Sequence, residues 1–373
     1  MTDVLTQPGT GKKSLWEEWT EEEGIPLHIT YGGTDLTTIT DLRPWKRMGG
    51  RGAFLINPDT CKGMCDAYIC VIDPKGSLRP QKHMYEEQVF VMEGHGATSV
   101  WLDERHKQTF EWEKGDYFAI PLNANFQHFN GGDAPAKILA VTAAPMMLNY
   151  FHNRDFIFNN PYVFTDRFAG QENFFNPASG KEYDGPTFST VMETNFVQDI
   201  THLEMPAWDA RGKGSTNIFF ELANSTFMAH ASEMPVGTYK SAHKHLATGW
   251  FGIILRGKGY SLAWKEDTMK WSEASEKKRY DWHEMCVLGY PDPWYHQHFN
   301  VGPEPARYLA VHFGSQRFPG FVWTDLWKVA ANTSQGGDNI EPAKEDPEIL
   351  ALYTREMAKA GLKVDPSMGK QRG

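Results

Sequence analysis

The sequence predicts an all-β protein built from two copies of one β-barrel domain, with short helices at its flanks. Between residues 51 and 148 the chain consists of short apolar runs of β type. Gly, Pro, Asn and Asp separate these runs, a pattern typical of β-sandwiches and barrels. A similar pattern returns between residues 206 and 320. The connector 149–205 is rich in Phe, Tyr and Asn and is expected to pack between the two domains.

An internal repeat is the strongest sign of two copies. The run 127–130, Gln-His-Phe-Asn, returns unchanged at 297–300. Pro135-Ala136 and the run 139–141 return at the same offset as Pro305-Ala306 and the run 309–311. Identical residues at one fixed offset indicate a duplicated domain.

One loop should differ between the copies. The stretch from Gly259 to Pro291 in the second copy is longer than the equivalent stretch from Gly96 to Pro121 in the first. We therefore expect a loop about seven residues longer in the second copy, within the charged stretch 265–279.

Helix signals lie at both ends of the chain. Ser14 followed by Glu17 fits a capping box, which predicts a helix in the N-terminal arm, residues 1–50. Asp346 and Pro347 suit the N-cap and first position of a helix in the C-terminal segment, residues 321–373.

Composition excludes several classes of function. The formal charge of −10 argues against nucleic acid or an anionic membrane as partner. No apolar run approaches the ~20 residues that span a bilayer, and the polar N-terminus lacks the apolar core of a signal peptide. The few cysteines lack paired zinc spacing and are interpreted as free thiols in a reducing compartment. We expect a cytoplasmic protein.

Three histidines form the candidate metal site. His243 and His245 form a His-x-His pair, which in a strand places both imidazoles on one face. His296, from a later strand, would complete a set of three nitrogen ligands. Imidazole suits Fe, Zn, Cu and Ni, and three protein ligands leave positions open for substrate or oxygen. The alternative is that these are unrelated histidines on polar strands.

The first copy lacks this set. Aligning the repeats places Gln81 opposite His243, and Phe126, which cannot bind a metal, opposite His296. His83, opposite His245, and Glu87 remain, and they make a poor site. We expect the first barrel to be structural and filled by side chains.

The second copy resembles the two motifs of the cupins. The residues that carry the resemblance are Gly237-x5-His243-x-His245, Gly257 and Gly259, and Pro291-x-Pro293-x2-His296-x3-Asn300. Cupins are double-sheet barrels of the jelly-roll type, so two copies imply a bicupin.

A narrower resemblance points to a reaction. His243-Lys244-His245 leading into 253–257, and the run 294–300, resemble gentisate 1,2-dioxygenases and their salicylate relatives. That family implies Fe(II) on three histidines and insertion of O2 into an aromatic ring bearing a hydroxyl and a carboxylate. Two features depart from it: the motif lies in the second copy, and Trp250 and Phe251 stand where the family has an arginine.

Further residues are candidates near the site. His298 faces the same side of its strand as His296, so it is a candidate acid–base group. Its repeat partner His128 leaves a shared structural role equally open. The candidates for substrate binding are Trp250 as a ring-stacking wall, Arg256 and Arg307 as a carboxylate clamp, and His312. For each of them the alternative is an ordinary core or surface role.

The leading expectation is an Fe(II)-dependent ring-cleaving dioxygenase for a small hydroxylated aromatic acid, acting as a homo-oligomer (dimer or tetramer). One alternative keeps the metal, with Mn or Zn, in a non-redox lyase, decarboxylase or isomerase. Thr248, Gly249 and Trp250 stand where many cupins bring a glutamate to the metal, which counts against oxalate-type decarboxylation. Another alternative is a non-catalytic, ligand-binding bicupin.

Overall fold

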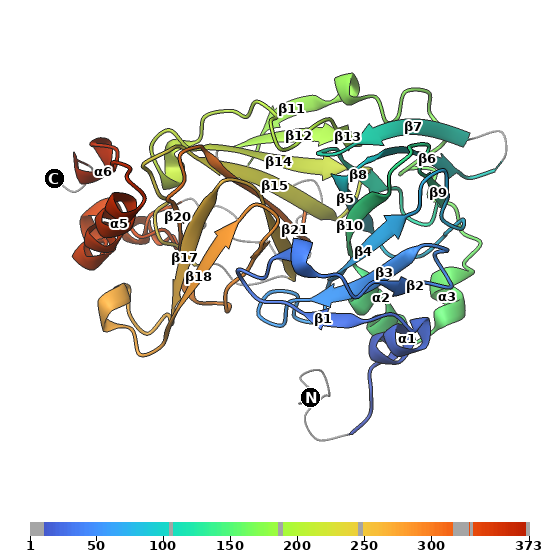
Figure 1. Ribbon diagram of the computed structural model, residues 1–373, viewed down its shortest axis with the longest axis horizontal. Helices are drawn as coiled ribbons and strands as arrows, with labels where there is room; N and C mark the ends of the chain where they lie inside the picture. Colours follow the sequence, from blue (N-terminus) through green and yellow to red (C-terminus); the bar gives the residue numbers. More distant parts are fainter. Residues whose placement is uncertain are drawn as a thin grey trace.

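The computed structural model consists of two β-domains side by side, with the helices at the periphery (Figure 1). It describes residues 11–103, 107–185, 189–244, 249–315, 328 and 331–370. Each domain pairs one large sheet with one three-stranded sheet, which is the double-sheet arrangement of a jelly roll.

The first domain carries an eight-stranded sheet in the order β1-β3-β4-β10-β5-β8-β13, with β2 paired to β3, and a small sheet β7-β6-β9. Its strands are β1 (Leu27–Ile29), β2 (Arg43–Pro44), β3 (Arg51–Ile56), β4 (Asp66–Ile72), β5 (Glu87–Glu93), β6 (His95–Trp101), β7 (Lys107–Glu113), β8 (Tyr117–Ile120), β9 (Asn125–Phe129), β10 (Ala136–Thr142) and β13 (Phe196–Val197).

The second domain carries a seven-stranded sheet in the order β11-β12-β14-β15-β21-β16-β19 and a small sheet β18-β17-β20. Its strands are β11 (Lys181–Asp184), β12 (Thr190–Thr194), β14 (Thr216–Leu222), β15 (Phe227–Met234), β16 (Trp250–Arg256), β17 (Lys258–Trp264), β18 (Lys277–His283), β19 (Val287–Leu288), β20 (Tyr295–Asn300) and β21 (Ala306–Phe313). The connector thus contributes β11 and β12 to this sheet and β13 to the other.

Equivalent hydrogen bonds in the two domains confirm the repeat. Asn130 Nδ2 donates to the carbonyl oxygens of Ile72, Asp73 and Ala134 and so fixes a buried turn. Asn300, its counterpart in the repeat, makes the equivalent bonds to Met234, Pro235 and Glu304.

The predicted loop extension is also present. In the first domain, β6 ends at Trp101 and β7 begins at Lys107. In the second, β17 ends at Trp264 and β18 begins at Lys277, so the connection is seven residues longer.

Both terminal helices begin where the sequence predicts. Helix α1 (Leu15–Glu23) has the Ser14–Glu17 capping box and ends at Gly24 in the left-handed conformation. Helix α5 (Pro347–Lys359) is capped by Asp346 and buries Tyr353, whose hydroxyl donates to the carbonyl oxygens of Thr238 and Asn300. The connector adds α2 (Ala144–Phe151) and α3 (Arg154–Phe158), and α6 (Ser367–Lys370) follows α5.

One hydrophobic cluster joins the two domains. It contains Val89 and Phe90 of the first large sheet together with Phe227, Phe251 and Val311 of the second. Because strand side chains alternate, the opposite face of β15, β16 and β21 points into the second barrel. That interior is much more polar than the shared cluster, and it contains the candidate site.

The four cysteines Cys61, Cys65, Cys70 and Cys286 are buried free thiols. None of the helices in the described parts of the chain has the length and apolar character needed to cross a membrane.

Candidate active site in the second barrel

His243 and His296 meet across two antiparallel segments. The N–H of each donates to the carbonyl oxygen of the other, at 3.1 and 2.9 Å. Both imidazoles are buried, and their Nε2 atoms lie 2.9 Å apart. In the first barrel Gln81 and Phe126 exchange the same two backbone bonds, so the alignment of the repeats made from the sequence is correct at this position.

The ring orientations suit metal binding. Nδ1 of His243 lies 3.3 Å from the carbonyl oxygen of Ser241, and Nδ1 of His296 lies 3.2 Å from that of Trp294. If each Nδ1–H donates to its carbonyl, both Nε2 lone pairs converge, which is the usual support of metal-binding histidines. Two nitrogen ligands ~2.1 Å from one ion and ~90° apart are ~3.0 Å from each other, so the observed separation fits adjacent ligands.

His245, the third predicted ligand, lies outside the described residues. Within the described ranges no group of three His, Cys, Asp or Glu side chains could hold a metal. The two converging nitrogens therefore fit a metal, and the completion of the set by His245 stays a prediction.

Arg211 is the residue that sequence reasoning missed. Its Nη1 lies 2.7 Å from His243 Nε2, and the side chain is buried. Burial lowers the pKa of Arg211 to about 10, so the guanidinium remains charged at neutral pH. It comes from the short 3-10 helix η3 (Asp209–Arg211), upstream of β14 and far from either histidine motif. No local signal in the sequence marks it.

His298 is held by a relay that both barrels share. Its Nδ1 lies 2.8 Å from Ser261 Oγ, and Trp282 Nε1 donates to the same hydroxyl at 2.9 Å. In the first barrel His128 Nδ1 lies 2.7 Å from Thr98 Oγ1, which accepts from Trp112 Nε1. The relay therefore occurs without a metal set in the first copy. The catalytic role predicted for His298 stays a prediction.

Two tyrosine rings lie against the histidines of strand β20. Tyr290 stacks on His296 with the ring centres 3.7 Å apart, and the Tyr308 ring lies 5.4 Å from that of His298. Burial raises the pKa of both phenols, so they keep their protons at neutral pH.

Trp250 and His312 face the same interior. The register pairs Trp250 with His312 in the second barrel as it pairs Glu87 with Thr142 in the first, so Trp250 occupies the position of Glu87. The Trp250 ring lies 5.1 Å from Tyr290. His312 Nε2 is 3.3 Å from His230 Nδ1, and burial lowers the pKa of His312 to about 4, so it is neutral.

The structure does not bring Arg256 and Arg307 to the site. Both guanidinium groups pair with Glu233, at 2.7 and 2.9 Å, and Arg307 also donates to the carbonyl oxygen of Ile200. The reason is strand alternation: Tyr308 points into the barrel, so its neighbour Arg307 points out. The predicted carboxylate clamp by these two residues is wrong, and Arg211 is the arginine beside the histidines.

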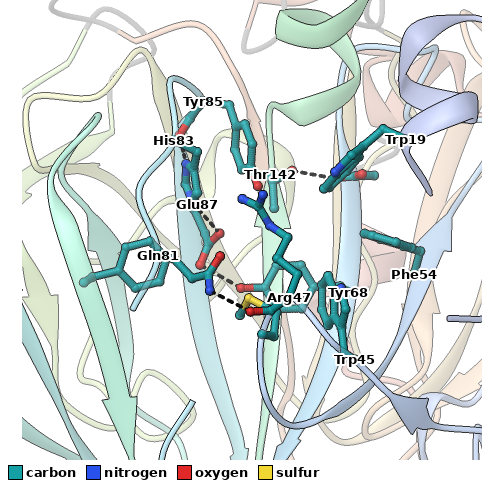
Figure 2. Close-up of a pocket in the computed structure, with 13 residues that line it drawn as sticks. Trp19, Trp45, Arg47, Phe54, Tyr68, Gln81, His83, Tyr85, Glu87 and Thr142 are labelled. Carbon is teal, nitrogen blue, oxygen red and sulfur yellow. Dashed lines mark hydrogen bonds and ion pairs between the residues drawn. The ribbon is translucent and has the colours of Figure 1, made fainter. Parts of the chain in front are cut away.

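The first barrel is nearly filled at the corresponding place (Figure 2). His83 Nδ1 lies 2.8 Å from the carbonyl oxygen of Tyr85, and Nε2 lies 3.3 Å from Glu87 Oε2. Tyr68 donates to the other oxygen of Glu87 at 2.8 Å. Arg47, from the N-terminal arm, lines the same pocket and lies over the ring of Phe158. The remaining cavity is about 10 Å³, which is room for one water molecule.

Comparisons with known proteins agree with this architecture. Residues 68–142 match the family model described as a cupin domain. No curated protein matches the chain.

The solved structures that match include several of oxalate decarboxylase from Bacillus subtilis. One variant of that enzyme aligns with a TM-score of 0.50 and 13% identity, covering 83% of this chain and 83% of that chain. Another aligns with a TM-score of 0.48 and 13% identity, covering 77% and 78%. At this identity the likeness concerns the fold alone. The protein has the all-β bicupin fold, with two jelly-roll domains and short flanking helices.

Proposed function

We propose that the second barrel is a metal-dependent active site that acts on a small carboxylic acid by non-redox chemistry, as a decarboxylase, lyase or isomerase. His243, His245 and His296 would hold the metal. The observation that carries the proposal is the charged, buried guanidinium of Arg211 beside the converging nitrogens of His243 and His296. Arginine binds carboxylates through two parallel hydrogen bonds, so it would place the acid group beside the metal.

His243 Nε2 has a single lone pair and cannot serve both Arg211 and a metal. Metal binding would therefore release the guanidinium from that nitrogen, and a substrate carboxylate would give it a new partner. A cavity of about 240 Å³ borders Arg211, but its lining includes the carboxylates of Asp209 and Glu345 and neither of the two histidines, so it is not assigned to the substrate.

The metal, when bound, would supply Lewis-acid polarisation of a substrate oxygen. Protein side chains would then donate the proton that the reaction needs. When a carbon–carbon bond to the carboxylate breaks, its electron pair stays on the substrate carbon and must take up a proton. Tyr308 Oη and His298 Nε2 are the candidate donors, since burial keeps the phenol protonated.

The second candidate function is an oxygen-dependent ring cleavage, with Fe(II) as the metal and a hydroxylated aromatic acid as the substrate. The observation that favours it is the ring wall of Trp250 and Tyr290. In addition, Trp250 occupies the position where the first barrel has Glu87, so this position offers no carboxylate to shuttle a proton.

One experiment separates the two reactions. The protein is loaded with Mn(II) or with Fe(II) without oxygen and incubated with small aliphatic acids and hydroxybenzoates. Substrate loss or CO2 release in the absence of oxygen supports the non-redox proposal. Turnover that requires oxygen, with matching oxygen uptake, overturns it in favour of the second candidate.

The role of Arg211 has its own test. Arg211→Met introduces the residue that the first barrel carries at the equivalent position, Met48. The variant should bind propionate at least about 10-fold more weakly, because a hydrogen bond to a charged group contributes about 1.5–3 kcal/mol. The matched control is Arg256→Met, which removes a guanidinium held by Glu233 and should leave propionate binding unchanged.

A further inference from the structure

Three interior positions differ in chemistry between the two barrels. In the first barrel Leu78 donates its backbone N–H to the carbonyl oxygen of His128, and Cys70 pairs with Ile138 across the sheet. In the second barrel Lys240 makes the same bond to His298, and Ser232 pairs with Tyr308. The first barrel thus builds this part of its interior from Leu, Cys and Ile, and the second from Lys, Ser and Tyr.

The repeat shows that the fold does not need a lysine here. Leu78 is as buried in the first barrel as Lys240 is in the second, at 2% and 0% exposure. Burying an amine costs free energy that burying a leucine side chain does not. A polar cluster that costs stability, in the barrel that also carries the histidines, indicates a function.

Lys240 is held without an acidic partner. Its Nζ donates to Ser232 Oγ and, at 3.3 Å, to Tyr308 Oη. Among the residues that the structure describes, no Asp or Glu pairs with it. Burial, followed by the charge of Arg211, lowers the pKa of Lys240 well below its usual value.

Lys240 and Arg211 flank one aromatic ring. The Arg211 guanidinium carbon lies 5.3 Å from the centre of the Trp208 ring, and Lys240 Nζ lies 5.8 Å from it. The two basic side chains therefore lie near the same ring. An acid with two anionic groups has a partner for each basic side chain, whereas a single carboxylate has a partner for only one.

We propose that the second barrel selects a substrate with two acidic groups, one bound by Arg211 beside the histidines and the other by Lys240 Nζ. This inference rests on the proposed function and narrows its substrate to a small aliphatic diacid or an acid with a second anionic group. Lys240 would act as the specificity-determining residue, and Ser232 and Tyr308 would orient its amine.

The test compares acids that differ only in the second carboxylate. Binding of propionate and malonate, and of butyrate and succinate, is measured by calorimetry on the full-length protein. Native protein should bind at least one diacid about 10-fold or more tightly than its matched monoacid. Lys240→Leu, which introduces the residue of the first barrel, should abolish that preference.

A second variant tests whether a folding defect in Lys240→Leu causes the loss of the preference. Lys240→Met keeps an unbranched apolar side chain of nearly the same length and should behave as Lys240→Leu does. The surface variant Lys258→Met is the matched control and should keep the native preference. Equal binding of monoacids and diacids by native protein, or a diacid preference that survives both Lys240 variants, would overturn the inference.

The same data separate this inference from the proposed function. Loss of monoacid binding in Arg211→Met with no effect of Lys240 would leave the proposed function standing without the diacid preference. Unchanged monoacid binding in Arg211→Met would count against the proposed function itself.

Discussion

His243 and His296 hold their Nε2 atoms 2.9 Å apart, and each ring directs Nδ1 at the carbonyl oxygen of the residue two positions upstream. Gln81 and Phe126 occupy the same two positions of the first barrel and exchange the same backbone hydrogen bonds. One backbone frame therefore carries a pair of potential ligands in one copy and a Gln–Phe pair in the other. This difference makes the first barrel a control for the second.

His298→Ala should keep its metal and lose rate. The residue faces the site but is not one of the predicted ligands, so metal content should stay at the native value. If His298 Nε2 transfers a proton, turnover should fall by about 10²–10⁴-fold. Metal analysis and steady-state kinetics check both parts.

The matched variant is His128→Ala, which removes the same Trp–hydroxyl–His relay from the first barrel. It should lower thermal stability and leave turnover per folded molecule unchanged. A native rate in His298→Ala, with a similar loss of stability in both variants, would reduce His298 to the structural role that the repeat also allows.

Asp66 should make stability depend on pH. Burial raises the pKa of Asp66 to about 7 in the folded protein, from an ordinary value of 3.8. Between these two values the folded state binds more protons than the unfolded state, so the free energy of unfolding falls as pH rises from about 4 to about 7. Each unit of difference corresponds to about 1.4 kcal/mol.

Asp66→Asn removes the titration and keeps one acceptor oxygen for Trp16 Nε1, while its amide N–H can donate to Thr142 Oγ1. Thermal unfolding of both proteins at pH 5, 6, 7 and 8 measures the effect. The stability of the variant minus that of the native protein should increase across this pH range and become constant above pH 7. A difference between the two that does not change with pH would contradict the assignment.

The second domain should not fold well alone. Phe227, Phe251 and Val311 on its outer sheet face belong to one apolar cluster with Val89 and Phe90 of the first domain. Exposing such a face costs about 25 cal/mol per Å² of apolar area. A fragment of residues 206–320 should be aggregation-prone and should unfold at a much lower temperature than the full chain. A monomeric, cooperatively unfolding fragment would show that the shared cluster contributes little.

The sequence predicted features that depend on local pattern or on the repeat. Strand positions, the capping box at Ser14 and the longer loop of the second copy follow from residue spacing. The repeat also predicted that Gln81 and Phe126 occupy the positions of His243 and His296. Arg211 was not predictable, because it reaches His243 from a short 3-10 helix and only the three-dimensional fold brings the two together. Arg307 was misassigned because the face of a strand depends on register, and a shift of one residue reverses it.

The most direct test of the account is the metal content of a variant that converts the second site into the first. His243→Gln combined with His296→Phe introduces the two residues that the first barrel carries at these positions. After reconstitution with Fe(II) or Mn(II) and removal of loose ions, native protein should retain close to one metal per chain. The double variant should retain almost none while unfolding cooperatively. Two metals per native chain, or an unchanged content in the double variant, would contradict the claim that the second barrel alone holds the metal.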